Sequence, residues 1–221
     1  MPNADPPAWV PAILLAAGAS RRMGTPKALL PCPPSGEPLV RRTARVLREG
    51  GATAAYVVVR PGGEGDAIAE AVSGLDGISV VVNPSPERGM LSSVQAGVRA
   101  AIAHGPPDWF LVSPCDLPRL EPGSVKAVLD MVRHSNARIV VPVYEGVRGH
   151  PTAFRGNLAA EALALVPETH GLNELLKRWA GSVAEAAVTV DGAVRDADTP
   201  EEWRDLTGAG HERRAIENDG E

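Results

Sequence analysis

The sequence predicts an α/β fold in which a mostly parallel central sheet lies between layers of helices. Two observations support this prediction. Short apolar runs recur along the chain, each bounded by Gly, Pro, Asn or Asp, and stretches with helical periodicity lie between them. Continuous runs of this length are typical of strands that are buried on both faces, as in a parallel sheet. Alternation of strand and helix favours right-handed crossovers between parallel strands.

Five apolar runs are expected to form strands, and a sixth run is weaker. The five strong runs are residues 12–17 (AILLAA), 54–59 (AAYVVV), 78–82 (ISVVV), 109–112 (WFLV) and 138–141 (RIVV). The weaker run is residues 183–190. Because 44% of the residues are hydrophobic and only 4% are aromatic, the core must consist mainly of Ala, Val, Leu and Ile.

Helices are expected between these runs, with a less regular pattern after residue 138. The helical stretches are residues 39–49, 66–72, 91–103 and 121–133, followed by 158–165 and 172–179. Residues 146–154 are expected to form a loop that enters a strand. The 221 residues contain no internal repeat and no long linker. We therefore expect one domain with a core over residues 12–206 and flexible tails at 1–10 and 208–221.

The charge of −5 is unevenly distributed along the chain. Residues 1–63 hold eight basic and three acidic residues (+5), and the remainder holds 14 basic and 24 acidic residues (−10). A basic segment in an acidic protein suggests local binding of a small polyanion. Four of its arginines, at positions 41, 42, 45 and 48, are better explained as a solvated helix face. Nucleic acid is not expected as a partner, because basic residues neither form a wide field nor alternate with aromatic residues.

The sequence also predicts a cytoplasmic protein with no membrane partner. No apolar run approaches the roughly 20 residues that would cross a bilayer. The segment MPNADPPAWVP lacks the basic and apolar regions of a signal peptide. The two cysteines, Cys32 and Cys115, form no disulfide framework and are compatible with a reducing compartment.

The loop after the first run has the composition of a phosphate-binding site. It reads LLAAGASRRMGTPK over residues 14–27, with Gly18, Gly24 and the cations Arg21, Arg22 and Lys27. Small residues allow a ligand to approach the backbone, and successive N–H groups can bind an anion. The spacing matches neither the Walker pattern nor the dinucleotide-binding fingerprint. We interpret the loop as a binding site for phosphate groups.

Two further segments supply carboxylates. Asp116 follows the run at residues 109–112, where it could hold Mg²⁺ or cap the next helix. Asp198 precedes Thr199, an expected helix N-cap, so it is either a second metal-facing acid or part of that helix start. Cys115 has no nearby His or Cys, so neither a nucleophile nor a zinc ligand is expected there.

Two polar positions remain open to either interpretation. Ser92 and Ser93 stand near an expected helix start, so one could cap the helix while the other presents a hydroxyl group to a ligand. His150 stands between Gly149 and Pro151, and without further context it fits an ordinary structural histidine.

Taken together, these motifs resemble the MobA-like nucleotidyltransferases. The segment LLAAGASRRMGTPKALLP is similar to the signature loop of that family, and PCDLP, GHPTAF and DADTPEEW stand where its later motifs occur. The resemblance runs from about residue 12 to residue 206. Ala-Ala-Gly at 16–18 and Pro-Cys-Asp at 114–116 resemble the molybdenum cofactor cytidylyltransferase branch. The guanylyltransferase branch reads Ala-Gly-Gly and Asn-Asp-Gln at these places.

The resemblance implies a Rossmann-like, three-layer nucleotidyltransferase fold and transfer of CMP from CTP to the phosphate of molybdopterin, with release of pyrophosphate. It implies Lys27, Arg22 and Asp116 as catalytic residues, Asp116 and Asp198 as ligands of Mg²⁺ or Mn²⁺, and a molybdoenzyme as a further partner. The implied acceptor-binding residues are Gly149 and His150. The implied nucleotide-binding residues are Leu15, Ala16, Ala17, Gly18, Ser20, Arg22, Met23, Gly24, Lys27, Ser93 and Asp116.

The resemblance is weaker on the acceptor side. The cytidylyltransferase branch usually carries Gly-Asp-x-Gly-x-Arg where this chain has ETHGLN at residues 168–173. The segment at residues 31–38 is also a few residues longer than the turn that usually follows Leu-Leu-Pro in this branch. Two alternatives therefore stay open. The first is the same transfer to another phosphorylated acceptor, such as a sugar or polyol phosphate, and the second is a non-catalytic carrier of nucleotide or cofactor for a molybdoenzyme.

Overall fold

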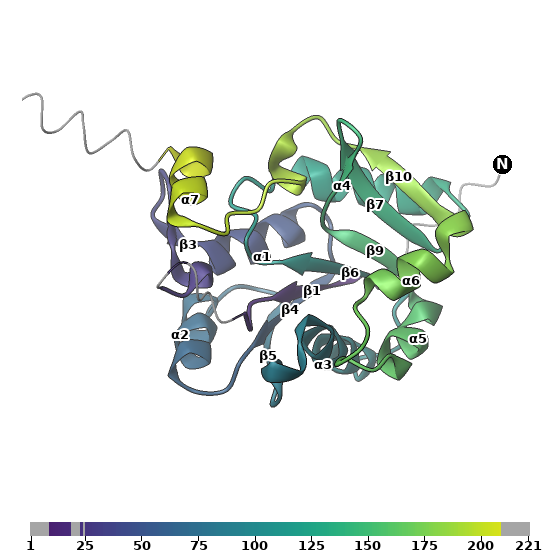
Figure 1. Cartoon of the computed structure of the whole chain (residues 1–221), viewed down its shortest axis with the longest axis horizontal. Coiled ribbons are helices and arrows are strands. Elements are labelled where there is room, and N and C mark those ends of the chain that lie inside the picture. Colours follow the sequence, from purple (N-terminus) through teal and green to yellow (C-terminus); the bar gives the residue numbers. More distant parts are fainter. Residues whose placement is uncertain (1–8, 19–22, 24, 209–221) are drawn as a thin grey trace, which may run out of the picture.

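The computed structural model describes residues 9–18, 23 and 25–208 (Figure 1). Within this part of the chain, the main sheet has eight strands in the order β10-β7-β9-β6-β1-β4-β5, with β8 beside β7. Its strands are β1 (Pro11–Leu15), β4 (Ala54–Val59), β5 (Ile78–Val82), β6 (Trp109–Pro114), β7 (Ile139–Tyr144), β8 (Val147–Arg148), β9 (Thr152–Arg155) and β10 (Val183–Ala187). β1 pairs in parallel with β4 and β6, β4 with β5, and β7 with β10. The predicted α/β fold with a mostly parallel sheet is confirmed.

Helices cover both faces of this sheet. They are α1 (Leu39–Glu49), α2 (Gly63–Ala71), α3 (Met90–Ile102), α4 (Pro122–His134), α5 (Ala159–Ala164), α6 (Asn173–Arg178) and α7 (Pro200–Thr207). Short 3-10 helices are η1 (Lys27–Leu29), η2 (Pro86–Arg88), η3 (Gly156–Leu158), η4 (Ala180–Ser182) and η5 (Asp191–Ala193). A hairpin of β2 (Pro31–Cys32) and β3 (Glu37–Pro38), which the sequence did not predict, precedes α1. None of the described helices is long and apolar enough to cross a membrane.

Alternate residues of the central strands point into two separate cores. Leu14 of β1 belongs to the core that also contains side chains of α1, α2, α4 and α7. Ile13 beside it belongs to the core that contains side chains of α3, α5 and α6. Val57 and Val58 of β4 divide between the two cores in the same way. Figure 1 accordingly shows α1 and α4 on one side of the strands and α3 and α5 on the other. This alternation explains why the central strands read as continuous apolar runs.

Two segments differ from their predictions. The run at 78–82 forms β5, but Val80 and Val82 are 40% and 54% exposed, so it is not buried on both faces as predicted. β5 lies at the end of the sheet, a position that apolar residues alone do not reveal. Residues 146–154, predicted as a loop that enters a strand, contain β8 and most of β9. β9 is inserted antiparallel between β6 and β7.

Residues 9 and 10 belong to the fold, although the sequence places them in a flexible tail. The N–H of Trp9 donates to Asp108 Oδ2 at 3.0 Å, and the N–H of Val10 donates to Thr53 Oγ1 at 2.9 Å. Val10 is also buried in the core. Gly208, also expected in a tail, ends α7, and its N–H donates to the carbonyl group of Arg204 at 2.8 Å. Residues 1–8 and 209–221, the rest of the expected tails, lie outside the described part of the chain.

The order of the strands fixes where a ligand can bind. From β1 the chain continues to β4 and β5 on one side, and later returns to place β6 on the other side. Ligands of open α/β sheets bind beyond the carboxyl ends of the strands at such a switch in order. β1 ends at Leu15, so Ala16 and Ala17, which were predicted to continue the strand, lie instead at this edge.

We expect Gly97→Ala to destabilise the protein, because α3 packs closely on the sheet at this position. A Cβ atom at Gly97 would overlap Cγ2 of Ile13 and lie 3.1 Å from Cγ2 of Val58. Overpacking of this kind costs about 1–3 kcal/mol. Urea unfolding should show this loss in the free energy of unfolding. Gly123→Ala in α4, where a Cβ would meet no atom within 4 Å, is the control and should not destabilise. Equal stability of both variants would contradict the packing argument.

Candidate active site

A cavity of about 450 Å³ lies at the carboxyl ends of β1 and β6. Seven of the residues predicted to bind nucleotide line it: Leu15, Ala16, Ala17, Gly18, Lys27, Ser93 and Asp116. Met23 packs against the core and does not line the cavity. Ser20, Arg22 and Gly24 lie outside the described residues. The structure therefore brings together three segments that the sequence treated separately.

Lys27 links the segment of Asp116 to a further segment, near the C-terminus. Its ammonium group contacts Oδ1 of Asp198, 171 residues along the chain, and lies 3.7 Å from Oδ2 of Asp116. The side chains are only partly exposed: 15% for Lys27, 27% for Asp116 and 30% for Asp198. Partial burial strengthens these charge contacts relative to those on an open surface. Lys27, which we expected to face a phosphate, lies between two carboxylates.

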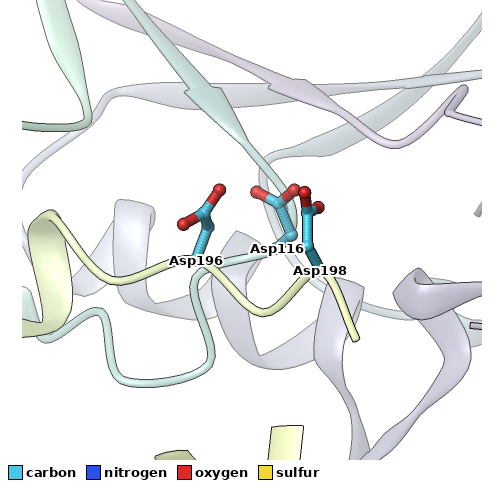
Figure 2. Close-up of side chains that lie close together, drawn as sticks. All are labelled: Asp116, Asp196 and Asp198. Atoms are coloured by element: carbon cyan, nitrogen blue, oxygen red, sulfur yellow. The ribbon is translucent and has the colours of Figure 1, made fainter. Parts of the chain in front are cut away.

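Asp196 joins Asp116 and Asp198 in a group of three carboxylates. Oxygen atoms of all three lie within 4.8 Å of one another, and Figure 2 shows the side chains directed to the same region. Asp196 was not predicted as a site residue. The available signal was its i, i+2 spacing to Asp198, because alternate side chains of an extended segment share one side. Ala197 between them is buried, and its N–H donates to the carbonyl group of Asp116 at 3.0 Å.

The charges in this group favour a divalent cation. Three carboxylates at this separation repel one another, and among the described residues Lys27 offsets part of this repulsion. Burial raises the pKa of Asp116, the positive charge of Lys27 lowers it, and the negative charge of Asp196 raises it further. Carboxylate oxygens are the donors that Mg²⁺ and Mn²⁺ prefer, whereas nitrogen and sulfur donors favour other metals. The donor set therefore fits a hard divalent ion held by Asp116, Asp196 and Asp198.

The start of α7 holds Asp198 in place. Thr199 is the N-cap residue, and its hydroxyl accepts a hydrogen bond from the N–H of Glu202 at 3.2 Å. The Glu202 carboxylate accepts from the N–H of Thr199 at 2.9 Å and from the N–H of Asp198 at 2.8 Å. These hydrogen bonds, from Asp198 first, lower the pKa of Glu202. Helix capping and the position of Asp198 near Lys27 are thus compatible, although the sequence offered them as alternatives.

The loop after β1 is also held by the end of β4. Nε of Arg60 donates to the carbonyl oxygen of Ala17 at 3.3 Å, and Nη1 of Arg60 lies 3.5 Å from Oε2 of Glu64, which lines the cavity. Sequence reasoning missed both residues. The only signal in the sequence was that Arg60 directly follows the expected strand at residues 54–59. That position places it at the carboxyl edge of the sheet, where the cavity lies.

The two residues expected to contact an acceptor lie near the carboxylates. A Cβ atom at Gly149 would overlap the carbonyl oxygen of Ala193, so a glycine lets this loop pack against the segment that leads to Asp196. The N–H of His150 donates to the same carbonyl oxygen at 2.8 Å. Burial lowers the pKa of His150, while the carbonyl group of Val112 and the charge of Asp196 act in the opposite direction. Neither residue lines the cavity.

Both cysteines are buried thiols. Burial raises the pKa of Cys32 to about 11 and also raises the pKa of Cys115 well above the ordinary value of a thiol. Each thiol is therefore protonated at neutral pH and unsuited to act as a nucleophile. Cys115 lines the cavity as a small apolar residue.

Two curated proteins are similar to this chain in sequence. A "Probable molybdenum cofactor guanylyltransferase" of Opitutus terrae is 38% identical over 108 residues, which are 49% of this chain and 48% of that protein. The chain thus matches about half the length of that relative. A protein of the same name from Bacillus cytotoxicus is 27% identical over 161 residues, which are 72% of this chain and 75% of that protein.

Solved structures share the fold over most of their length. Rv0371c of Mycobacterium tuberculosis H37Rv is 28% identical, with a TM-score of 0.73 over 90% of this chain and 98% of that chain. A structure described as the complex of Rv0371c with manganese aligns at 23% identity with a TM-score of 0.67, covering 90% of this chain and 98% of that chain.

The family model described as the MobA-like NTP transferase domain matches residues 12–185. That range contains the loop after β1, Lys27, Ser93 and Asp116, and it ends before Asp196 and Asp198. It covers most of the 221 residues. The chain therefore belongs to the MobA-like NTP transferase family.

Proposed function

We propose that this chain transfers a nucleoside monophosphate from a nucleoside triphosphate to the phosphate of an acceptor. A phosphate oxygen of the acceptor forms a bond to the α-phosphorus, the bond from that phosphorus to the bridging oxygen breaks, and pyrophosphate leaves. The observation that carries the proposal is Lys27, held beside Asp116 and Asp198 at a cavity that Ala17 and Gly18 also line. Binding alone would not need a cation held between carboxylates.

The residues of this chain act mainly by positioning and by charge. A phosphate group is already a nucleophile, so no general base is needed. Lys27 would stabilise charge on the α-phosphoryl group, and the N–H groups after β1 would bind phosphate oxygens. A divalent ion on Asp116, Asp196 and Asp198 would neutralise phosphate charge. The manganese complex described for Rv0371c supports such an ion.

We propose molybdopterin as the acceptor. The curated relatives are named for the molybdenum cofactor, and the loop at Gly149 and His150 lies near the carboxylates, where an acceptor phosphate would have to approach. Pyrophosphate release with and without molybdopterin tests this choice, with sugar and polyol phosphates as comparison acceptors. A chain that binds nucleotide and releases no pyrophosphate with any of them would support the carrier alternative instead.

The nucleotide is proposed to be CTP, with GTP as the competing candidate. Ala17 lines the cavity and carries a methyl group that glycine would lack, which reduces the room for a purine. The names of both curated relatives favour GTP. The two observations point in opposite directions, so nucleotide preference is the first property to measure.

We expect kcat/KM for CTP to exceed that for GTP by about 10- to 200-fold, because one ill-fitting carbon is worth about 1–3 kcal/mol. Ala17→Gly should narrow the difference. Ala28→Gly removes a methyl group from another cavity-lining residue and should leave the ratio unchanged. Steady-state measurement of kcat/KM for CTP and GTP with wild type, Ala17→Gly and Ala28→Gly tests this nucleotide preference. A wild-type enzyme that uses GTP at least as well as CTP would establish guanylyl transfer.

We expect Lys27→Ala to lower kcat by about 10²–10³, because it removes a charge contact made in the transition state. The Kd of the nucleotide should change much less. Lys126→Ala, an exposed lysine of α4, is the control and should behave as wild type. Single-turnover rates and nucleotide titrations separate the two effects. Unchanged turnover together with a large loss of affinity would show that Lys27 only binds.

We expect Asp116→Asn to abolish metal-dependent activity and to weaken Mn²⁺ binding, because the amide keeps the shape but loses the charge. Asp198→Asn should act in the same way but more weakly. Asp130→Asn, which changes an exposed carboxylate paired with Arg133 in α4, is the control. Mn²⁺ titration followed by electron paramagnetic resonance measures the metal, and urea unfolding checks the fold. Normal activity of Asp116→Asn would leave only a structural role for this residue.

A further inference from the structure

Asn83 makes a buried hydrogen-bond network beside the cavity. It follows β5, is 2% exposed, and its N–H donates to the carbonyl group of Val59 at 2.9 Å. Its side-chain Oδ1 accepts from the N–H of Ser85 at 3.0 Å. Its Nδ2 donates to Oγ of Ser92 at 2.8 Å and to Oγ of Ser93 at 3.0 Å. Because a backbone N–H can only donate, the amide oxygen must face Ser85 and the NH₂ group must face the two serines.

This orientation fixes what each serine can do with its own proton. Both hydroxyl oxygens accept from Asn83, so each O–H is directed elsewhere. The Ser92 hydroxyl donates to the carbonyl group of Gly89 at 2.7 Å and has a second acceptor on Ser85 at 3.1 Å. Among the described residues, Asn83 Nδ2 is the only hydrogen-bond partner of Ser93 Oγ. Ser93 lines the cavity and Ser92 does not. The O–H of Ser93 is therefore left for a ligand.

The two sides of the cavity differ in character. Residues around Ser93 belong to α3 and η2 and include the apolar Pro86 and Met90. The neighbours of Ser93 in α3 pack into the core on one face of the sheet, whereas the residues next to Lys27 in η1 pack into the core on the other face. Phosphate groups suit the cationic side at Lys27. A neutral hydroxyl donor in apolar surroundings suits a neutral acceptor atom instead.

We propose that Asn83 is a positioning residue that directs the Ser93 hydroxyl to donate a hydrogen bond to the nucleotide base. The acceptor would be a carbonyl oxygen or a ring nitrogen of that base. The inference rests on the proposed function, since it takes the ligand to be a nucleoside triphosphate. The inference adds Asn83, which does not line the cavity, to the residues that act in nucleotide binding. It makes the Ser93 hydroxyl the donor, and the base the acceptor, of one hydrogen bond that selects the ligand.

The first test compares Ser93→Ala with Ser92→Ala, its matched control, by calorimetric titration with CTP, GTP and inorganic tripolyphosphate. Loss of one hydrogen bond should weaken binding of the preferred nucleotide about 3- to 10-fold in Ser93→Ala. Affinity for tripolyphosphate, which has no base, should not change. Ser92→Ala should bind all three probes as the wild type does. A purely structural role of the serines would instead alter tripolyphosphate binding as well.

The second test reverses the direction of the hydrogen bond. Asn83→Asp keeps the shape but replaces the NH₂ donor with an oxygen that accepts, so the Ser93 proton turns away from the ligand. In the Ser93→Ala background the same change should cost much less affinity for the nucleotide, because Asn83 acts through Ser93. Together these variants form a double-mutant cycle. Any general effect of the added charge lowers affinity in both backgrounds and also affects tripolyphosphate binding, so the cycle removes it. Asn83→Ala, which adds no charge, replaces Asn83→Asp in the cycle if the latter does not fold.

The outcomes separate the inference from the proposed function. Non-additive losses in the cycle, with unchanged tripolyphosphate binding by Ser93→Ala, support the role of Asn83. Additive losses overturn it, as does an equal loss in Ser92→Ala and Ser93→Ala. Nucleotide binding by Ser93→Ala that equals wild type overturns the inference and leaves the proposed function intact. A wild-type chain that binds no nucleoside triphosphate contradicts both.

Discussion

Strand β1 constrains the rest of the molecule, because it is hydrogen-bonded along both edges and buried on both faces. It pairs in parallel with β4 and with β6, and Ala12, Ile13 and Leu14 are all fully buried. Three parallel strands side by side must end at the same edge of the sheet. The loops that follow β1, β4 and β6 therefore meet there, and each contributes a residue to the site. The cavity is a consequence of this pairing, since the order of strands reverses at β1.

Charge governs the chemistry at this edge. Lys27 stands among three carboxylates from two distant segments, and the two neighbouring thiols are held neutral by burial. This donor set fits a cation and, together with Lys27, the charge of phosphate groups. The described backbone beside it is held at Ala17 and at the start of α3.

Side-chain hydrogen bonds from neighbouring strand ends provide that arrangement. Arg60, after β4, donates to the carbonyl group of Ala17, and Asn83, after β5, orients Ser92 and Ser93. The contacts to Ala17 and Ser93 hold residues that line the cavity, and neither Arg60 nor Asn83 lines it. Preorganised donors of this kind need no rearrangement when charge or a ligand appears, which is why they are effective in binding and catalysis.

The sequence by itself determined the α/β alternation and the central strands, and it singled out Gly18, Lys27 and Asp116, which line the cavity. These features are local, because apolar runs, glycines and charged residues after a strand are visible within a short window. Only the tertiary structure decided that β9 enters antiparallel between β6 and β7 and that β5 is an exposed edge. It alone brought Asp196 to Asp116, Arg60 to Ala17, and Asp198 to Lys27 across 171 residues. Such contacts depend on which strands pair and in what order, and a local pattern of apolar and polar residues is compatible with several such orders.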